Sequence, residues 1–330
     1  MHKACIEVRI RMDNKDKTDS TCMVSICIAV YNHEKYIAQC LNSFFEQKMD
    51  FPYEILIGND KSTDGSAKVL ENYADRVTVI NREQNLGLCA NQYDLFLRAK
   101  GKYVFYFSGD DYMYDPLALQ KQVDFLEAHP EYYAVSAWNY MYRHSDGKMY
   151  ANYTEDFIRE FTMEDFLRDG EIPTTHGLVR NTFREDRETN GYLVKGARNN
   201  EEMKLWTYTL SKGKRYILPE YFHVYRNVDE EGMSNYNSTH TMLDMFEDNY
   251  GDLCMLRREF KGRYNYTPMI LKKCNAYSLR CDSVGTLLKL LGRMKAADVF
   301  RLLWYKIYLK THGYHAPAKW SQKEYLILKE

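Results

Sequence analysis

Residues 24–66 of the chain read VSICIAVYNHEKYIAQCLNSFFEQKMDFPYEILIGNDKSTDGS. The stretch contains two short apolar runs, SICIAV and YEILIG, and the segment between them has apolar residues at helical spacing. A run that is apolar at every position is typical of a strand buried on both faces of a sheet, whereas the spacing between the runs favours an amphipathic helix. The order strand, helix, strand predicts a right-handed βαβ unit with parallel strands.

The same alternation continues beyond this stretch. Strands are predicted for VTVI at 77–80, KYVFYF at 102–107 and AVSAW at 134–138, with helices between them. The helix after KYVFYF is expected to have Asp115 as its N-cap and Pro116 in its first turn. We therefore expect an α/β protein with a Rossmann-like, mostly parallel sheet flanked by helices, followed by a helical C-terminal region.

The bulk composition excludes several classes of protein. The 330 residues include 45 Lys and Arg against 46 Asp and Glu, so no overall positive field indicates a nucleic-acid partner. None of the eight cysteines belongs to a C-x-x-C pair, so neither a zinc site nor a disulfide framework is expected. The first residues lack the apolar core of a secretory signal, and no stretch is long and apolar enough to span a membrane. We expect a cytoplasmic protein.

Polar clusters follow three of the predicted strands. YNHE lies at 31–34, NDKSTDGS at 59–66 and SGDD at 108–111. In open α/β sheets, ligands bind outside the carboxyl ends of the parallel strands. The pattern alone therefore predicts a ligand site at this edge of the sheet.

Asp110 and Asp111 are the first candidates in that site. Two adjacent carboxylates at the end of an apolar strand are costly unless something neutralises them. A Mg²⁺ or Mn²⁺ ion bound to a diphosphate does so, because these ions prefer oxygen ligands. The alternative is that Asp111 only begins a turn before the next helix.

Asp60 lies at the corresponding end of the second strand. Its carboxylate can accept hydrogen bonds from the imide of a nucleobase. The alternative is an Asx-turn within NDKSTDGS, for which Asn59, Ser62, Asp64 and Gly65 are suited. Taken alone, Asp60 fits the turn better, and the other acidic clusters shift the balance toward a ligand role.

Three motifs in sequence order resemble the nucleotide-binding half of family 2 glycosyltransferases. They are SICIAVYNHEKYIAQCLNSFFEQ, YEILIGNDKSTDGS and NLGLCANQYDLFLRAKGKYVFYFSGDDYMYDPLALQKQVDFLEAHPEY. The resemblance covers residues 23–145 and extends more loosely to about residue 235. It implies the A-type glycosyltransferase fold and an inverting transfer from a nucleotide-diphosphate sugar, typically UDP-linked. The acceptor would be a saccharide or a lipid-linked molecule in cell-surface polysaccharide or glycolipid synthesis.

The resemblance also implies roles for the matching residues. Those for nucleotide-sugar binding are Ala29, Val30, Tyr31, Asp60 and Asp110, and those for the Mn²⁺ or Mg²⁺ cofactor are Asp110 and Asp111. Within this set, Asp60 would hold the base, and Asp110 would contact the ribose as well as the cation. Two positions depart from the family pattern: Asn59 replaces an acid before K-S-T-D, and Ser108 replaces an acid two residues before the aspartate pair.

The catalytic base implied by the resemblance is Glu202, in NNEEMKLW. The cation can stabilise the leaving nucleoside diphosphate, so one carboxylate suffices to remove the acceptor proton. Glu201 is adjacent, but neighbouring helical residues point about 100° apart, so only one of the two is expected to face the site. The alternative is that both are solvated acids favoured by the helix dipole.

Two further side chains are candidates for the site. His176, in PTTHG, can touch phosphate or acceptor, but a lone histidine beside a strand is more often structural. Arg226, in HVYRNVDEEGMS, lies in a segment resembling the loop that closes over the donor in this family, and it can meet phosphate. The alternative for Arg226 is a surface position in an edge strand.

These patterns divide the chain into three parts. Residues 1–22 are polar and are predicted to be a disordered extension. Residues 23–235 are predicted to form the catalytic domain, with a nucleotide-binding half at 23–145 and an acceptor half at 146–235. Residues 236–330 are predicted to form the helical C-terminal region.

The C-terminal region contains two apolar stripes at helical spacing, at 284–294 and 300–307, accompanied by lysines and arginines. Such helices can lie on anionic lipid, which would bring the protein to the inner face of the membrane. More often such stripes are the core faces of packed helices, and this interpretation is favoured.

Two other functions compete with an active transferase. A glycosyltransferase-like binding or scaffold protein without turnover would be consistent with Asn59 and Ser108. A nucleotidyltransferase would need a glycine-rich phosphate loop near the first strand, and YNHEKY has no glycine.

Overall fold

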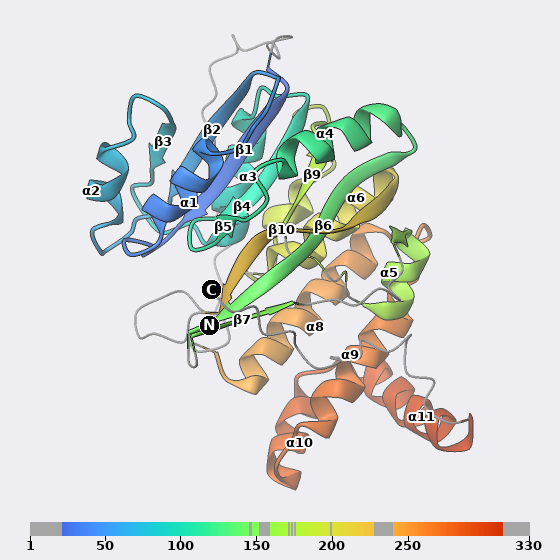
Figure 1. The fold of residues 1–330 in the computed structure, drawn as a ribbon. Coiled ribbons are helices and arrows are strands. Elements are labelled where there is room, and N and C mark those ends of the chain that lie inside the picture. Colours follow the sequence, from blue (N-terminus) through green and yellow to red (C-terminus); the bar gives the residue numbers. More distant parts are fainter. Residues whose placement is uncertain are drawn as a thin grey trace.

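The computed structural model describes residues 22–144, 147–151, 159–170, 172, 174, 176–198, 200–227 and 240–312. This part of the chain forms one ten-stranded sheet with helices on both faces and a group of helices extending away from it (Figure 1). The predicted α/β class with a helical C-terminal region is confirmed. The predicted disordered extension lies outside the described residues, apart from Cys22.

The strands alternate with helices in the first half of the chain. They are β1 (Val24–Val30), β2 (Tyr53–Asn59), β3 (Thr78–Asn81), β4 (Tyr103–Ser108), β5 (Tyr112–Met113), β6 (Tyr132–Arg143), β7 (Lys148–Ala151), β8 (Glu160–Phe161), β9 (Gly177–Arg180) and β10 (Lys214–Asn227).

The helices are α1 (Ile37–Phe45), α2 (Ser66–Glu71), α3 (Leu88–Arg98), α4 (Ala118–Ala128), α5 (Met163–Asp169), η1 (Gly191–Val194), α6 (Glu201–Lys212), α8 (Met242–Glu259), α9 (Thr267–Leu279), α10 (Val284–Gly292) and α11 (Ala296–His312). The helix expected from Asp115 begins instead at Ala118, because Asp115 forms a preceding turn and accepts the amide of Leu117.

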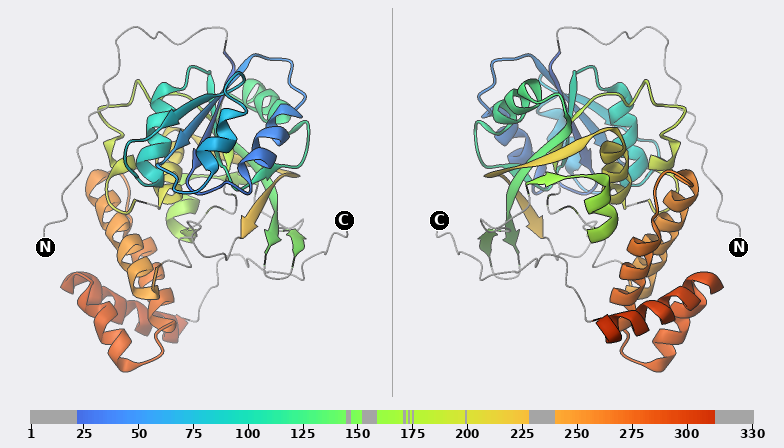
Figure 2. Two further views of the ribbon diagram at one scale, coloured as in Figure 1. Left: turned by 90° about the vertical axis from the view of Figure 1, so that its left-hand side faces the viewer. Right: turned by 90° about the vertical axis from the view of Figure 1, so that its right-hand side faces the viewer.

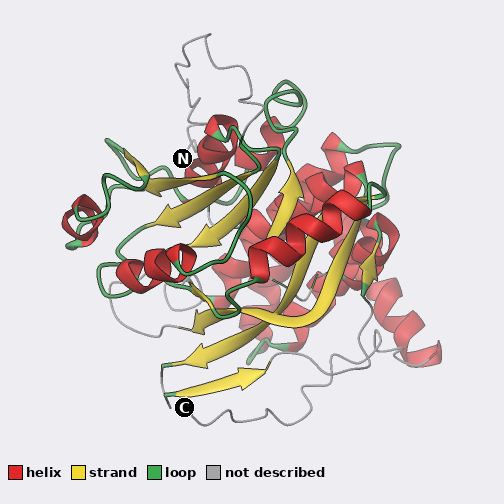
Figure 3. Ribbon diagram, turned by 45° about the horizontal axis from the view of Figure 1, so that its top comes forward, coloured by secondary structure: helices red, strands yellow, loops and turns green. Residues whose placement is uncertain are grey.

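The order of strands in the sheet is β3-β2-β1-β4-β9-β6-β10-β5, with β7 beside β6 and β8 beside β10. Figure 3 shows the strands of the sheet in yellow, with helices in red packed against them. Strands β3, β2, β1 and β4 are parallel, as predicted. Strand β9 pairs antiparallel with both β4 and β6, so the sheet becomes mixed beyond β4. The parallel part places the ends of β1, β2 and β4 at one edge.

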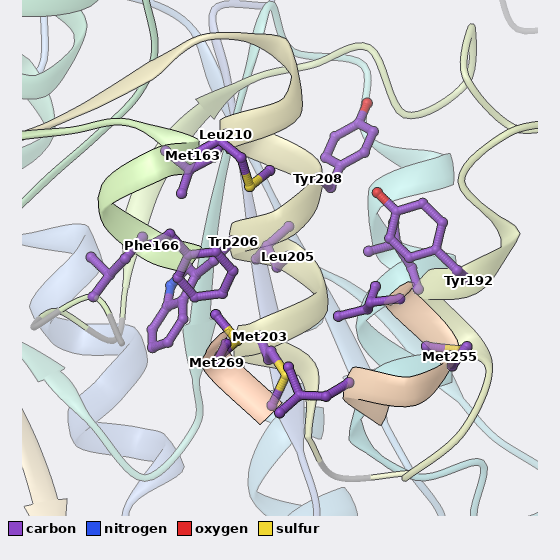
Figure 4. Close-up of a cluster of buried hydrophobic side chains, with 14 of the residues drawn as sticks. Met163, Phe166, Tyr192, Met203, Leu205, Trp206, Tyr208, Leu210, Met255 and Met269 are labelled. Carbon is purple, nitrogen blue, oxygen red and sulfur yellow. The ribbon is translucent and has the colours of Figure 1, made fainter. Parts of the chain in front are cut away.

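Alternate residues of the central strands enter two different cores. In β1, Ile26 and Ile28 join a cluster with residues of α1 and α4, while Cys27 joins a cluster with residues of α3, α6, α8 and α9. Because successive side chains of a strand point to opposite faces, α1 and α4 cover one face and α3 and α6 the other. Figure 4 shows part of the second core, where Trp206 of α6 lies near Phe166 of α5.

Helices α10 and α11 lie at the end of the molecule farthest from the parallel strands (Figure 2). Leu290 of α10, Leu302 of α11 and Met294 between the two helices are buried. Phe300 and Trp304 are 63% and 60% exposed, so the prediction that the second stripe is a packed core face is wrong. The buried side of α11 is instead the one that carries Leu302, and the apolar stripe faces outward.

Candidate functional site

The ends of β1, β2 and β4 meet at one edge of the sheet. Val30 pairs with Asn59 of β2, and Ala29 pairs with Ser108 of β4. The amide of Gly109 donates to the carbonyl of Ala29 at 2.9 Å, and the amide of Asp60 donates to the carbonyl of Val30 at 2.8 Å. The three polar segments predicted from the sequence therefore leave the sheet side by side.

Of the three aspartates predicted for the site, Asp110 is the one that remains partly exposed. Its side chain is 23% accessible, and Oδ2 lies 3.8 Å from Nε2 of His33. Its other oxygen accepts the hydroxyl of Ser108. The serine that departs from the family pattern thus contacts Asp110 directly.

Asp111 is placed differently from its neighbour, because its side chain is fully buried. Oδ2 lies 2.6 Å from Nε2 of His176, and Oδ1 accepts the amide of Arg226 at 2.7 Å. Burial, and then the charge of Asp110, raises the pKa of Asp111 to about 6. Asp111 is therefore bonded inside the protein through both oxygens, and His176 has the structural contact that the sequence favoured.

The residues at this edge fit a divalent cation that is shared with substrate. No group of three or more His, Cys, Asp or Glu side chains gathers for a metal within the described part of the chain. Mg²⁺ is usually held by one or two carboxylates together with substrate phosphates, so a complete cage of protein ligands is not required. Asp110 suits such a site by its exposure, whereas Asp111 would first have to give up its bonds to His176 and Arg226.

Arg226 is buried, and its guanidinium holds the backbone of Asp110 in place. Its guanidinium lies 4.7 Å from the ring centre of Tyr36 and 4.8 Å from that of Tyr112. Nη1 donates to the carbonyl of Asp110 at 2.6 Å, and Nη2 donates to the side chain of Gln39. Arg226 is therefore not a surface residue of an edge strand, and it fixes the backbone that carries the exposed carboxylate.

Asp60 is buried and holds the loop after β3. Its oxygens accept the amides of Leu86 at 2.7 Å and Gly87 at 2.8 Å. Burial raises the pKa of Asp60, while the two amide hydrogen bonds oppose that shift. The Asx-turn of this segment is formed by the neighbours of Asp60, since the amide and hydroxyl of Ser62 donate to Asn59 Oδ1. Base recognition by Asp60 stays a prediction.

Glu202 lies in the first turn of α6, next to Glu201. Burial raises the pKa of Glu201 to about 7. Burial, and then the charges of Asp111, Asp110 and Glu202, raise the pKa of Tyr225. The charges of Glu202 and Glu201 therefore both act on the phenol on which the aspartate pair acts.

Two residues of this region were not assigned from the sequence. His33 lies beside Asp110, and its buried Nδ1 has no hydrogen-bond partner among the described residues. Arg198 donates to the carbonyls of Asn85 and Leu86 at 2.6 and 3.2 Å. The position of His33 in YNHE was a signal that could have identified it, whereas Arg198 lies in a segment without regular pattern.

Comparisons with known sequences agree with this geometry. The family described as "Glycosyl transferase family 2" matches residues 25–188. EpsE of Bacillus subtilis, assigned as a glycosyltransferase, is 26% identical over 93% of this chain and 98% of its own length. TuaG of the same species, assigned as a teichuronic acid biosynthesis glycosyltransferase, is 27% identical over 64% of this chain and 82% of its own length. Uncharacterized protein Rv1520 of Mycobacterium tuberculosis is 41% identical, but the match spans 33% of this chain and about a third (32%) of that protein.

Solved structures share the fold. Staphylococcus aureus TarS residues 1–349 with UDP-GlcNAc superpose with a TM-score of 0.61 at 17% identity, over 85% of this chain and 81% of that one. The mannosyltransferase PcManGT of Pyrobaculum calidifontis, with GDP-Man and Mn²⁺, gives 0.53 at 15% identity, over 90% and 84%. At such identities the likeness concerns the fold alone, and it agrees with the family match. Through residues 25–188, the chain belongs to glycosyl transferase family 2.

Proposed function

We propose that the protein is an inverting glycosyltransferase that transfers a sugar from a UDP-linked donor to a saccharide or lipid-linked acceptor of the cell surface. The observation that supports the proposal is that Tyr31, Asp60 and Asp110 follow the ends of β1, β2 and β4, which lie side by side in the sheet, while Glu202 lies in the first turn of α6. UDP-GlcNAc in TarS supports a uridine donor, and the assignment of TuaG to teichuronic acid synthesis supports a polysaccharide acceptor.

The donor would lie across the edge from β2 to β4. Ala29, Val30 and Tyr31 would line the nucleotide, Asp60 would lie at the base, and Asp110 would contact the ribose and a divalent cation. Mn²⁺ in PcManGT supports the choice of Mn²⁺ or Mg²⁺. A cation bound there would supply positive charge to the departing diphosphate. We assign Asp111, the second aspartate of the pair, to holding His176 and β10 in place for Asp110.

Glu202 would act as the general base. The acceptor hydroxyl oxygen attacks the anomeric carbon, its proton passes to the Glu202 carboxylate, and the bond from the anomeric carbon to the diphosphate oxygen breaks. One displacement inverts the configuration at that carbon. No general acid is needed, because the leaving group departs as an anion.

A binding or scaffold protein without turnover is the competing proposal. Its support is the loss of two family acids at Asn59 and Ser108. Ser108, however, donates to the carboxylate of Asp110, so this part of the site is still held together. Incubation with UDP-sugars, Mn²⁺ and a saccharide acceptor separates the two proposals: release of UDP coupled to acceptor glycosylation supports the enzyme, and UDP binding without any turnover supports the scaffold.

We further propose that the protein works in the cytoplasm and touches the inner face of the membrane through α10 and α11. Their outward side chains include Leu288, Phe300, Trp304 and Ile307, all more than half exposed. The segment from α9 through α11 carries nine Lys and Arg residues against two Asp, although the whole chain has a net charge of −1. No described helix is long and apolar enough to cross a membrane. Apolar side chains among cations suit the surface of an anionic bilayer.

Vesicle sedimentation tests this contact. The protein should pellet with vesicles containing phosphatidylglycerol, and Phe300→Ser with Trp304→Ser should remain in the supernatant. Equal behaviour of the two proteins, or self-association that these substitutions abolish, would count against a lipid surface.

A further inference from the structure

The helix that carries Glu202 is preceded by four described residues, Gly196, Ala197, Arg198 and Asn200, hereafter the pre-helix segment. The side chain of Asn200 makes no capping hydrogen bond to the helix. The start of α6 therefore takes its position from other contacts of this segment.

Two buried charges supply those contacts. Lys204 of α6 and Asp252 of α8 form an ion pair in which both side chains are fully buried, with Nζ 3.4 Å from Oδ2. Lys204 also donates to the carbonyl of Ala197 at 2.6 Å. Asp252 accepts the amide of Ala197 at 2.9 Å and the side-chain amide of Asn200 at 3.0 Å. Both backbone groups of Ala197 are thus held by opposite charges from two different helices.

The contact with α8 requires a glycine. Gly196 has φ +79°, and a Cβ atom there would lie 2.0 Å from Oδ1 of Asp252. A side chain at this position would be strained and would displace the carboxylate. Gly196 therefore leaves free the space that the carboxylate of Asp252 occupies.

The pre-helix segment also contacts the nucleotide side of the site. Arg198 donates to the carbonyls of Asn85 and Leu86 at 2.6 and 3.2 Å. The amides of Leu86 and Gly87 bind the carboxylate of Asp60. One short segment thus joins the residue proposed for the base to the helix of the proposed catalytic carboxylate.

We propose that Lys204 and Asp252 are positioning residues for sugar transfer. The buried pair holds the pre-helix segment so that Glu202 meets an acceptor beside the donor. The inference rests on the proposed function, since it needs a catalytic carboxylate on α6. A buried ion pair often stabilises a fold no more than an apolar pair of the same volume does, which favours a positioning role over a purely stabilising one.

A second ion pair, which also involves α8, provides the matched control. Nη2 of Arg257, also on α8, lies 2.9 Å from Oδ2 of Asp298 on α11, and that carboxylate is buried too. Among the described residues, Arg257 donates hydrogen bonds to Asp298 and Cys254 and none to the pre-helix segment. Loss of this pair should loosen the C-terminal helices without moving Glu202.

The experiment compares Lys204→Met with Arg257→Met in the full chain, below the unfolding temperature of both variants. Lys204→Met should lower kcat by about 100-fold, because a displacement of about 1 Å at a reacting group costs that much. The KM for donor should change by less than about threefold, since the edge of the sheet is intact. Arg257→Met should keep the kcat of the unaltered protein.

The double variant Lys204→Met with Asp252→Leu separates positioning from stability. It should regain much of the thermal stability lost in the single variant, because no charge is left unpaired, but it should not regain kcat. Normal kcat in Lys204→Met, an equal loss in Arg257→Met, or recovery of kcat with stability in the double variant would each overturn the proposal.

Hydrogen–deuterium exchange gives a readout that does not depend on activity. The peptide containing Ala197 should exchange faster in Lys204→Met and at the normal rate in Arg257→Met. If the unaltered protein transfers no sugar, the proposed function fails while exchange still tests the contact. Unchanged exchange in Lys204→Met would overturn the positioning role even in an active enzyme.

Discussion

Nε2 of His176 lies 2.6 Å from Oδ2 of Asp111, and both side chains are buried. The other oxygen of Asp111 accepts the amide of Arg226, whose guanidinium in turn holds the carbonyl of Asp110. The second aspartate of the pair thus ties the turn after β4 to β10, and the first is left facing the edge of the sheet.

Asp111→Ala should therefore be inactive and less stable. The substitution leaves the amide of Arg226 and the ring of His176 without their acceptor, which costs about 3 kcal/mol in the free energy of unfolding. Asp111→Asn retains an acceptor for the amide of Arg226, so its free energy of unfolding should fall much less. Urea unfolding and a transfer assay measure both effects, and an Asp111→Ala protein as stable as the unaltered one would contradict this role.

Glu202→Gln should lose turnover while it keeps donor binding. Removal of a general base lowers kcat by about 100-fold or more, and the amide has nearly the same shape. UDP affinity, measured by titration calorimetry, should be unchanged, and Glu201→Gln should be affected far less. A fully active Glu202→Gln enzyme would remove this residue from the mechanism.

Asp60→Ala should weaken both the fold and UDP binding. The amides of Leu86 and Gly87 would lose their acceptor, at a cost of about 2 kcal/mol in stability. Gly87→Ala provides an independent test of the same loop, because its φ is +84° and a Cβ would lie 2.8 Å from the side chain of Arg198. Both variants should show a lower unfolding temperature and a smaller shift with UDP. Unaltered UDP binding in both variants would show that the loop held by Asp60 takes no part in nucleotide binding.

The stability of the C-terminal helices should fall in acid. Burial alone would raise the pKa of Asp298. Hydrogen bonds from Arg257, Tyr250 and Arg301 outweigh this effect and lower the pKa to about 2. A lowered carboxyl pKa contributes stability above the unfolded value of about 4, and this contribution is lost as the pH falls toward 2. It amounts to about 2 kcal/mol, of which about half is lost by pH 3. Urea unfolding at pH 6 and pH 3 should show this extra loss in the unaltered protein and not in Asp298→Asn; an equal pH dependence would contradict it.

The parallel half of the fold was predictable from the sequence because its strands are buried on both faces. SICIAV and YEILIG read as continuous apolar runs, and the helices between them have one apolar side. Strand β9 left no comparable signal: it has four residues, and it pairs antiparallel between β4 and β6. Pairing between distant segments is decided by the whole sheet rather than by a local pattern.

The site was predictable as a location but less so in its contacts. Asp60, Asp110 and Asp111 all follow strands, yet only the structure distinguishes the exposed carboxylate from the two that hold backbone amides. Almost any residue type can supply a main-chain amide, so the sequence does not reveal which residue donates to each aspartate. Lys204 and Asp252 lie on different helices and read as ordinary helix charges, so their pairing could not be foreseen.

The most direct test of the account is the effect of Mn²⁺ on UDP affinity in the unaltered protein and in Asp110→Asn, measured by titration calorimetry. The account predicts that Mn²⁺ strengthens UDP binding to the unaltered protein by at least about tenfold, and that Asp110→Asn loses this gain while it still binds UDP weakly without metal. Equal UDP affinity in both proteins, with and without Mn²⁺, would contradict a cation held between Asp110 and the diphosphate.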